Sequence, residues 1–150
     1  MLEYVISGGQ TGIDQLALIT AKTFGIKTGG IAPKTYRTEM GSNYVLKEFG
    51  LIEDVFFNYS SRTEKNVINS DGTILFGNTS SFGTKQTIKF LIKHNKPYLD
   101  NPTPEEMYDF INNNNIKILN VAGNRGSKLC DDDIKKYAEI MVEFFSKFKK

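Results

Sequence analysis

The stretch Ile6-Ser7-Gly8-Gly9-Gln10-Thr11-Gly12-Ile13-Asp14 decides how the rest of the sequence is interpreted. The apolar run Tyr4-Val5-Ile6 predicts a short buried strand before it, and apolar residues at helical spacing from Ile13 to Phe24 predict a helix after it. Glycines and hydroxyl residues between a strand and a helix leave backbone N–H groups uncovered at the positive end of the helix dipole. Because such a turn attracts anions, we predict that this loop binds a phosphate or an equivalent oxyanion.

The same loop also admits a purely structural interpretation, because glycine-rich turns occur wherever a strand must reverse into a helix. Its spacing is not the G-x-G-x-x-G of dinucleotide-binding loops, and no Lys-Ser or Lys-Thr pair follows Gly12 as in a Walker A loop. Asp14 falls in the first turn of the predicted helix, where it either complements the helix dipole or contacts a ligand. The pattern therefore predicts an anion-binding loop but does not identify the anion.

Composition excludes several classes of protein. A chain of 150 residues can bury a substantial core, and 19 Lys and Arg against 17 Asp and Glu predict no general attraction to nucleic acid or to acidic membranes. A single cysteine, Cys130, argues against internal disulfides and suits a reducing cytosol. The one histidine, His94, and Cys130 lack metal-ligand spacing, so no metal site is predicted. With no signal peptide or membrane span in the sequence, we expect a cytoplasmic protein.

Strand, polar loop and helix alternate about five times along the chain, which predicts parallel crossovers. We therefore predict one α/β domain over residues 1–150, Rossmann-like and doubly wound in three layers, with a mostly parallel sheet of about five strands. Helices are predicted to begin at Ser61, with Glu64 three residues on, and at Thr103, with Pro104 at the first helical position and Glu106 at the third. The strands predicted after the first are 26–31, 73–76, 96–99 and 116–121. The segment 40–57 is hard to interpret, with a short helix suggested at 44–46 and a strand at 55–57.

Two acidic features are interpreted as structural. Asp71 precedes its strand, at the opposite end of the sheet from the glycine loop, and is interpreted as a turn residue. Asp131, Asp132 and Asp133 could suggest a metal site, but they also open the last helix, where they complement its dipole. We favour the second interpretation.

Polar loops follow several predicted strands at their carboxyl ends, where open α/β sheets bind ligands. N–H groups and arginines suit a phosphate, and a carboxylate suits sugar hydroxyls. Glu39 is the catalytic candidate if the protein is an enzyme. The predicted ligand-binding residues are Ser7, Gly8, Gly9, Gln10, Thr11, Gly12, Asp14, Pro33, Lys34, Arg37, Glu39, Arg62, Asn66, Gly77, Asn78, Gly83, Thr84, Gly123, Asn124 and Arg125.

Five motifs in order along the chain resemble the YpsA-related branch of the SLOG superfamily, which is also catalogued under the name of molybdenum carrier proteins. The motifs are Ser7–Asp14, Pro33-Lys34 with Arg37–Gly41, Arg62-Thr63 with Asn66-Val67, Ser70–Thr73, and Asn120–Gly123 with Arg125. The resemblance implies a Rossmann-like fold that binds nucleotides or nucleotide-derived ligands, and assembly into homo-oligomers. Relatives include the cytokinin-activating phosphoribohydrolases and a molybdenum-cofactor carrier, so the resemblance leaves the function open.

The sequence departs from these relatives at two places. The phosphoribohydrolases use a P-G-G-x-G-T-x-x-E loop, whereas the equivalent segment here, Ser80–Thr87, lacks the glycine pair and has Thr87 in place of the glutamate. Gln15 stands where the branch usually has arginine. Both departures favour binding over hydrolysis.

Three functions therefore stay open from the sequence. The leading hypothesis is a sensor, carrier or sequestering protein for a phosphorylated small molecule such as a nucleotide, an ADP-ribose derivative or a cyclic nucleotide signal. The second is an N-glycosidase or phosphoribohydrolase that uses Glu39. The third is a carrier of the molybdenum cofactor. The only cofactors that these hypotheses imply are a bound nucleotide or a pterin.

Overall fold

In the computed structural model, which describes residues 1–149, six parallel strands form one sheet in the order β5-β2-β1-β8-β6-β7. The last strand, β8, lies in the middle of the sheet between β1 and β6. The predicted Rossmann-like α/β fold is confirmed, with six strands in place of about five. The strands are β1 (Tyr4–Ile6), β2 (Lys27–Ala32), β5 (Leu51–Glu53), β6 (Gly72–Phe76), β7 (Tyr98–Asp100) and β8 (Ile118–Gly123).

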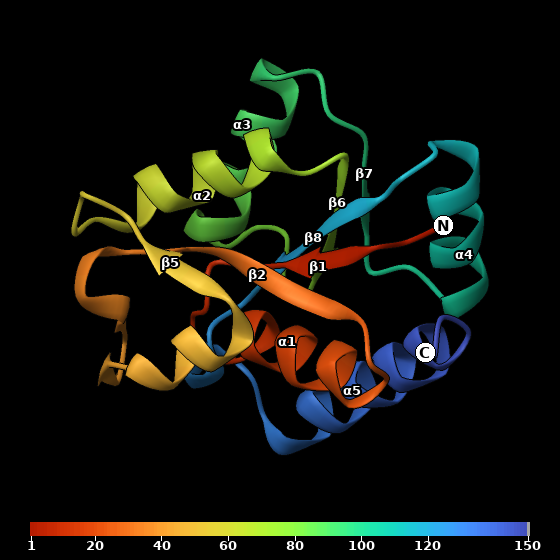
Figure 1. The fold of residues 1–150 in the computed structure, drawn as a ribbon, viewed down its shortest axis with the longest axis horizontal. Coiled ribbons are helices and arrows are strands. Elements are labelled where there is room, and N and C mark those ends of the chain that lie inside the picture. The colour runs from red at the N-terminus through yellow and green to blue at the C-terminus, as the bar shows by residue number, and fades with distance from the viewer. Residues whose placement is uncertain (150) are drawn as a thin grey trace.

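Helices cover both faces of this sheet and complete the predicted three layers. Figure 1 shows α2 and α3 on one face, α1 and α5 on the other, and α4 beside the C-terminal part of α5. Within residues 1–149, no helix is both long enough and apolar enough to cross a membrane. The helices are α1 (Ile13–Thr23), α2 (Tyr59–Asn69), α3 (Phe82–Lys93), α4 (Pro104–Asn113) and α5 (Asp131–Ser146).

The core has a large part under α1, α4 and α5 and a smaller part under α2 and α3. Successive residues of a strand point to opposite faces, so Ile74 of β6 packs into the large part and Leu75 into the small one. All five residues of β6 are buried, as expected for a central strand of a parallel sheet with both faces covered. The sheet is thus a rigid support for the loops at its carboxyl edge.

The segment from Met40 to Phe57, which the sequence left hard to interpret, contains the second strand of a small hairpin, a 3₁₀ turn that includes the short helix suggested at 44–46, and a strand. The hairpin pairs β3 (Arg37–Thr38) with β4 (Gly41–Ser42), and the 3₁₀ turn spans Tyr44–Phe49. The predicted strand at 55–57 is wrong. The strand is Leu51–Glu53, where Leu51 is buried, whereas the side chains of 55–57 are more than half exposed and have no sheet to cover.

The start of α2 also differs from the prediction. Asn58 is the N-cap, because its Oδ1 accepts a hydrogen bond from the amide of Ser61 at 2.9 Å. Ser61 therefore lies inside the helix, and the predicted capping box with Glu64 is wrong. The predicted start of α4 at Thr103 is confirmed, and a capping box is found there, since Thr103 and Glu106 each accept from the other's amide.

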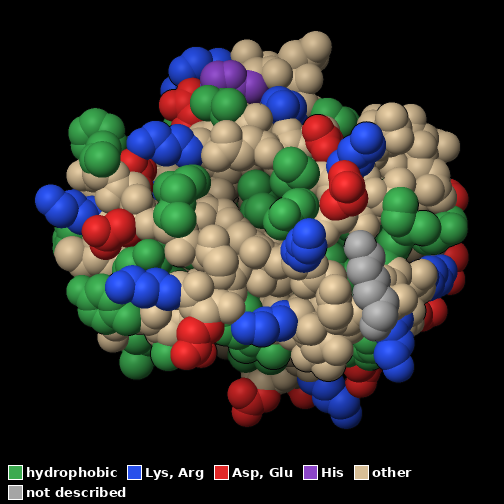
Figure 2. All heavy atoms as spheres, in the orientation of Figure 1, with side chains coloured by type: hydrophobic (Ala, Val, Ile, Leu, Met, Phe, Trp, Pro, Cys, Tyr) green, Lys and Arg blue, Asp and Glu red, His purple; other side chains and the backbone are tan. Residues whose placement is uncertain are grey.

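Asp71 has the structural role predicted for it. It lies at the amino end of β6, and its Oδ2 accepts hydrogen bonds from the amides of Lys117 and Ile118 at 2.9 and 2.8 Å. Asp131, Asp132 and Asp133 lie in the first turn of α5, the position that complements the helix dipole. On the face seen in Figure 2, cationic and anionic side chains are interspersed, and neither sign forms a continuous patch.

Candidate functional site

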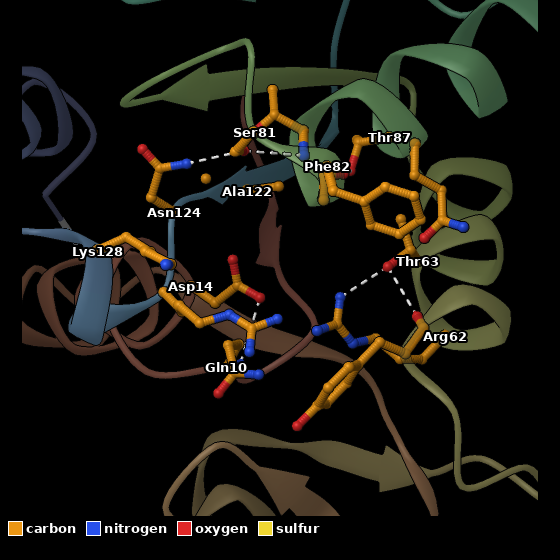
Figure 3. Close-up of a pocket in the computed structure, with 16 residues that line it drawn as sticks. Gln10, Asp14, Arg62, Thr63, Ser81, Phe82, Thr87, Ala122, Asn124 and Lys128 are labelled. Atoms are coloured by element: carbon orange, nitrogen blue, oxygen red, sulfur yellow. Dashed lines mark hydrogen bonds between the residues drawn. The ribbon is translucent and has the colours of Figure 1, made fainter.

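A cavity of about 240 Å³ lies where the carboxyl ends of β1, β8 and β6 meet the N-terminal turns of α2 and α3. Figure 3 shows side chains from these elements around one shared space. The predicted residues that line it are Gln10, Asp14, Arg62, Gly83, Thr84, Gly123, Asn124 and Arg125. The residues that line it without having been predicted are Tyr59, Thr63, Ser81, Phe82, Gln86, Thr87, Ala122 and Lys128.

Three arginines surround the ring of Tyr59. The guanidinium carbons of Arg37, Arg62 and Arg125 lie 4.5, 5.4 and 5.5 Å from the ring centroid. Within residues 1–149, none of the three has a carboxylate oxygen within ion-pair distance. The charge of Arg125 lowers the pKa of Arg62, and a bound anion would relieve this repulsion between like charges. Arg62 and Arg125 line the cavity and favour an anion there, whereas Arg37 lies outside it and donates to the carbonyl of Phe57 at 3.2 Å.

Arg62 lies flat against the glycine loop. A Cβ on Gly8 would come within 2.7 Å of the guanidinium, so Gly8 creates the space that Arg62 occupies. One nitrogen, Nη1, donates to the Thr63 hydroxyl at 2.8 Å, while the buried Nε has no partner in the described part of the chain. Burial lowers the pKa of Arg62 and the nearby Asp14 carboxylate opposes this, so the guanidinium stays charged.

The amides of the β1–α1 loop are not uncovered as predicted. The amide of Gly9 donates to Ser7 Oγ, and that of Gln10 donates to Asp14 Oδ2, both at 3.3 Å. The amide of Thr11 donates to the Gln10 side chain at 3.0 Å. Gly9 is covered further by leucine side chains of the 3₁₀ turn and β5. The side chains of the loop itself thus supply the acceptors that we expected from a ligand.

Asp14 is the only acidic residue among those that line the cavity within residues 1–149. It is 4% exposed, and burial raises the pKa of its carboxyl to about 6. The charge of Arg62 and the amides of Gln10, Gly123 and Gly8 limit that rise in pKa. A buried carboxyl with a shifted pKa in a cleft is typical of a functional residue.

The opposite wall of the cavity is the N-terminus of α3, which Asn124 holds in place. Asn124 Nδ2 donates to Ser81 Oγ at 3.0 Å and to the carbonyl of Asn78 at 3.2 Å, while its Oδ1 accepts from the amide of Asn78. A side chain on Gly83 would meet no atom within 4 Å. A ligand can therefore approach the first turn of α3, where helix amides lack intrahelical partners.

Gln10 contributes a free donor to the cavity. Its Oε1 accepts from the amides of Thr11 and Glu39 at 3.0 and 2.9 Å, which fixes the orientation of the amide group. Its Nε2 is buried and has no hydrogen-bond partner among residues 1–149. An unpaired buried donor is costly, and a ligand acceptor would satisfy it.

Glu39 lies outside the cavity and clamps two loops together. Its carboxylate accepts from the hydroxyl of Thr11 and from both the amide and the hydroxyl of Ser127. Burial opposes ionisation, but the hydrogen bonds from Ser127 and Thr11 outweigh it and hold the pKa of Glu39 below its ordinary value. The clamp is therefore present above the ordinary pKa and lost as pH falls through the lowered one.

We expect Glu39→Ala to loosen this clamp without unfolding the sheet. Amide hydrogen exchange should become at least tenfold faster in residues 37–42 and 125–128, because the carboxylate joins these segments. Glu48→Ala removes an exposed carboxylate that accepts no side-chain hydrogen bond in the described chain, and it should leave exchange unchanged. Equal exchange in both variants would contradict the clamping role.

Other predicted residues have structural partners away from the cavity. Asn66 joins α2 to β2, because its side chain pairs with both the amide and the carbonyl of Ile31 at 2.9 Å. The Ser7 hydroxyl donates to the carbonyl of Asp14 at 3.0 Å, and the amide of Gly77 donates to Asn101 at 2.9 Å. Pro33 is buried and Lys34 is exposed, and neither lines the cavity.

Thr87 occupies the position at which the phosphoribohydrolase loop has a glutamate, so its contacts bear on the hypothesis of hydrolysis. The residue that replaces the expected glutamate is 5% exposed, lines the cavity and donates its hydroxyl to the carbonyl of Gly83 at 3.0 Å. A glutamate here would place a carboxylate inside the cavity. The chain instead has a neutral hydroxyl that is already bonded.

The comparisons with known proteins agree with the Rossmann-like fold. A model of the circularly permutated YpsA SLOG family matches residues 5–145. The chain belongs to this family. A crystal structure from Syntrophus aciditrophicus SB, named as a "putative molybdenum carrier protein", is 35% identical with a TM-score of 0.82, and the match covers 96% of this chain and 94% of that one.

The remaining comparisons give no information on the function of this member of the SLOG family. The structure of (E)-4-hydroxy-3-methyl-but-2-enyl diphosphate reductase is 16% identical with a TM-score of 0.40, over 95% of this chain and 59% of that one. That likeness is too weak to bear on fold or function. No curated protein matches the sequence.

Proposed function

We propose that this protein binds a phosphorylated, nucleotide-derived small molecule in the cavity, as a sensor, carrier or sequestering protein. The observation that carries the proposal is the pair Arg62 and Arg125, which line the cavity beside Tyr59 and have no ion-pair partner within residues 1–149. Guanidinium groups bind phosphate oxygens in pairs of hydrogen bonds. The unpaired Nε2 of Gln10 supplies a further donor.

Binding is favoured over hydrolysis because neither of the two positions expected to supply a catalytic glutamate does so. Glu39 is held in its clamp by Thr11 and Ser127 and does not line the cavity. Thr87 replaces the glutamate of the phosphoribohydrolase loop. We therefore expect no release of adenine when the protein is incubated with AMP or ADP-ribose. Release of the base that Glu39→Gln abolishes would support the glycosidase function instead.

Calorimetry with AMP, ADP-ribose, cyclic dinucleotides and pyrophosphate tests the binding function. We expect at least one compound to bind, and Arg62→Gln or Arg125→Gln to weaken it about tenfold to hundredfold, because each removes a charge-assisted hydrogen bond. Lys34→Gln removes an exposed charge outside the cavity and serves as the matched control. No binding by any compound, or equal losses in all three variants, would contradict the proposal.

A carrier of a molybdenum-binding pterin is the second candidate, because of the name given to the 35% identical relative. Arg62 and Arg125 fit the phosphate of such a pterin as well as that of a nucleotide, and the bound cofactor would supply the metal. Mass spectrometry of the molecule that co-purifies with the native protein separates the two candidates. A pterin would establish the carrier function, and a nucleotide would exclude it.

A further inference from the structure

Asp14 is a carboxylate in a cavity whose other charged groups are cations. From α2, Arg62 and the phenol of Tyr59 line the same space, and the segment after β8 adds Arg125 and Lys128. The lining residues of α3 and its N-cap are uncharged. A phosphate that enters this cavity is attracted to the cations and repelled by Asp14.

The carboxylate of Asp14 is fixed and still able to accept. The hydroxyl of Ser7 anchors the main chain of Asp14, the amide of Gln10 donates to its Oδ2, and the amides of Gly123 and Gly8 also stabilise the carboxylate. Within residues 1–149, no side chain donates to either carboxylate oxygen. Figure 3 shows the carboxylate directed into the space between Arg62 and Asn124.

We propose that Asp14 accepts a hydrogen bond from a hydroxyl group of the ligand, so that the site selects phosphate esters of a ribose-like diol over bare phosphate or pyrophosphate. This inference rests on the proposed function, and it assigns the two ends of the ligand to two parts of the cavity. The phosphate lies toward Arg62 and Arg125, and the hydroxyls lie toward Asp14. A carboxylate can only accept, which makes a donor on the ligand its complement.

The ionisation of Asp14 sets the pH dependence of this selection. Burial raises the pKa of the Asp14 carboxyl to about 6, so the group is mostly ionised at pH 7.5 and mostly protonated at pH 5. Ionised carboxylates are the stronger acceptors. The preference for a diol should therefore weaken as pH falls through 6, whereas a phosphate placed against Asp14 would bind better as pH falls.

Calorimetry with AMP and 2′,3′-dideoxy-AMP tests the inference. Both compounds carry the same phosphate, so its own titration cancels in the ratio of their affinities. At pH 7.5 we expect wild type to prefer AMP by about tenfold or more, as for a hydrogen bond to a charged group. The preference should shrink at pH 5, and Asp14→Asn should reduce it to about twofold at both pH values.

The outcomes separate the inference from the proposed function. If both compounds bind wild type equally, or if Asp14→Asn keeps the full preference, Asp14 does not select a hydroxyl and the phosphate site stands. If AMP, 2′,3′-dideoxy-AMP, ADP-ribose, cyclic dinucleotides and pyrophosphate all fail to bind, the proposed function fails and this inference fails with it. The wild-type ratio at two pH values gives an answer even if a variant folds poorly.

Discussion

Gly30→Ala is expected to leave little folded protein. Gly30 lies in β2 at a φ of +129°, a conformation that residues with a Cβ rarely adopt. Its Cβ would also overlap the carbonyl oxygen of Ser7, which belongs to the backbone and cannot rotate away. Strain and overlap together should cost more than about 4 kcal/mol, a large part of the stability of an ordinary domain. Chemical denaturation of the purified protein measures the loss.

Gly29→Ala is the matched control for this substitution. Gly29 is the neighbouring residue of the same strand, its φ lies outside the left-handed region, and its Cβ would come no closer than 3.6 Å to another atom. We expect the free energy of unfolding of the Gly29→Ala variant to stay within about 1 kcal/mol of the wild-type value. Comparable losses of stability in both variants would show that any added side chain destabilises β2. That result would contradict a specific close approach of Gly30 to Ser7.

Asp14→Asn is expected to stabilise the protein by about 3 kcal/mol at pH 7.5. The pKa of an aspartate carboxyl is ordinarily 3.8, and that of Asp14 is about 6 in the fold. Because the folded state binds the proton more tightly, ionised Asp14 weakens folding at every pH above 6, and the effect vanishes below 3.8. Asparagine resembles the protonated form. The gain should therefore be full at pH 7.5 and absent near pH 3.5.

Thermal unfolding between pH 3.5 and 8 checks this prediction, with an expected rise in Tm of roughly 6–12 °C at pH 7.5. Asp109→Asn removes the same charge from an exposed position of α4 and should change the Tm little at any pH. A Tm for Asp14→Asn at or below that of wild type at pH 7.5 would show that the carboxylate is better solvated than its burial indicates.

The ionised carboxylate of Asp14 is expected to lower the stability of the fold and to improve the selection of the ligand. A carboxylate that destabilises the fold by burial persists where a ligand makes use of it, and natural proteins often lose stability at their binding sites. The two measurements on Asp14→Asn should therefore move in opposite directions. The variant should melt higher and discriminate less between AMP and its dideoxy analogue.

Most of the fold follows from local patterns in the sequence. Alternation of apolar runs with polar loops predicted the parallel sheet, and Thr103 with Glu106 predicted the start of α4, because these signals lie within a few residues of one another. The strand at Leu51–Glu53 was missed because it has only three residues, of which only Leu51 is buried. Its pairing with β2 is what makes it a strand, and that pairing is not visible in a local pattern.

The site is harder to predict because its partners lie far apart in the chain. The glycine loop was identified, but the sequence could not show that Asp14 and Gln10 would satisfy its amides. Arg62 lies three residues from Tyr59 on the same helix, whereas the approach of Arg125 to Tyr59 depends on how α2 lies on the sheet. Asn58 as the N-cap of α2 is the local signal that would have placed Tyr59 and Arg62 on the first turn.

The position of β8 has a consequence for how the chain reaches its native state. Tyr4 of β1 pairs with Ile118 of β8, and Gly72 of β6 pairs with Leu119, so the middle of the sheet joins distant parts of the sequence. Closing such long loops costs chain entropy before the new contacts compensate for it, which slows folding. Until then, Val5 and Ile74 expose apolar edges that can associate with other chains.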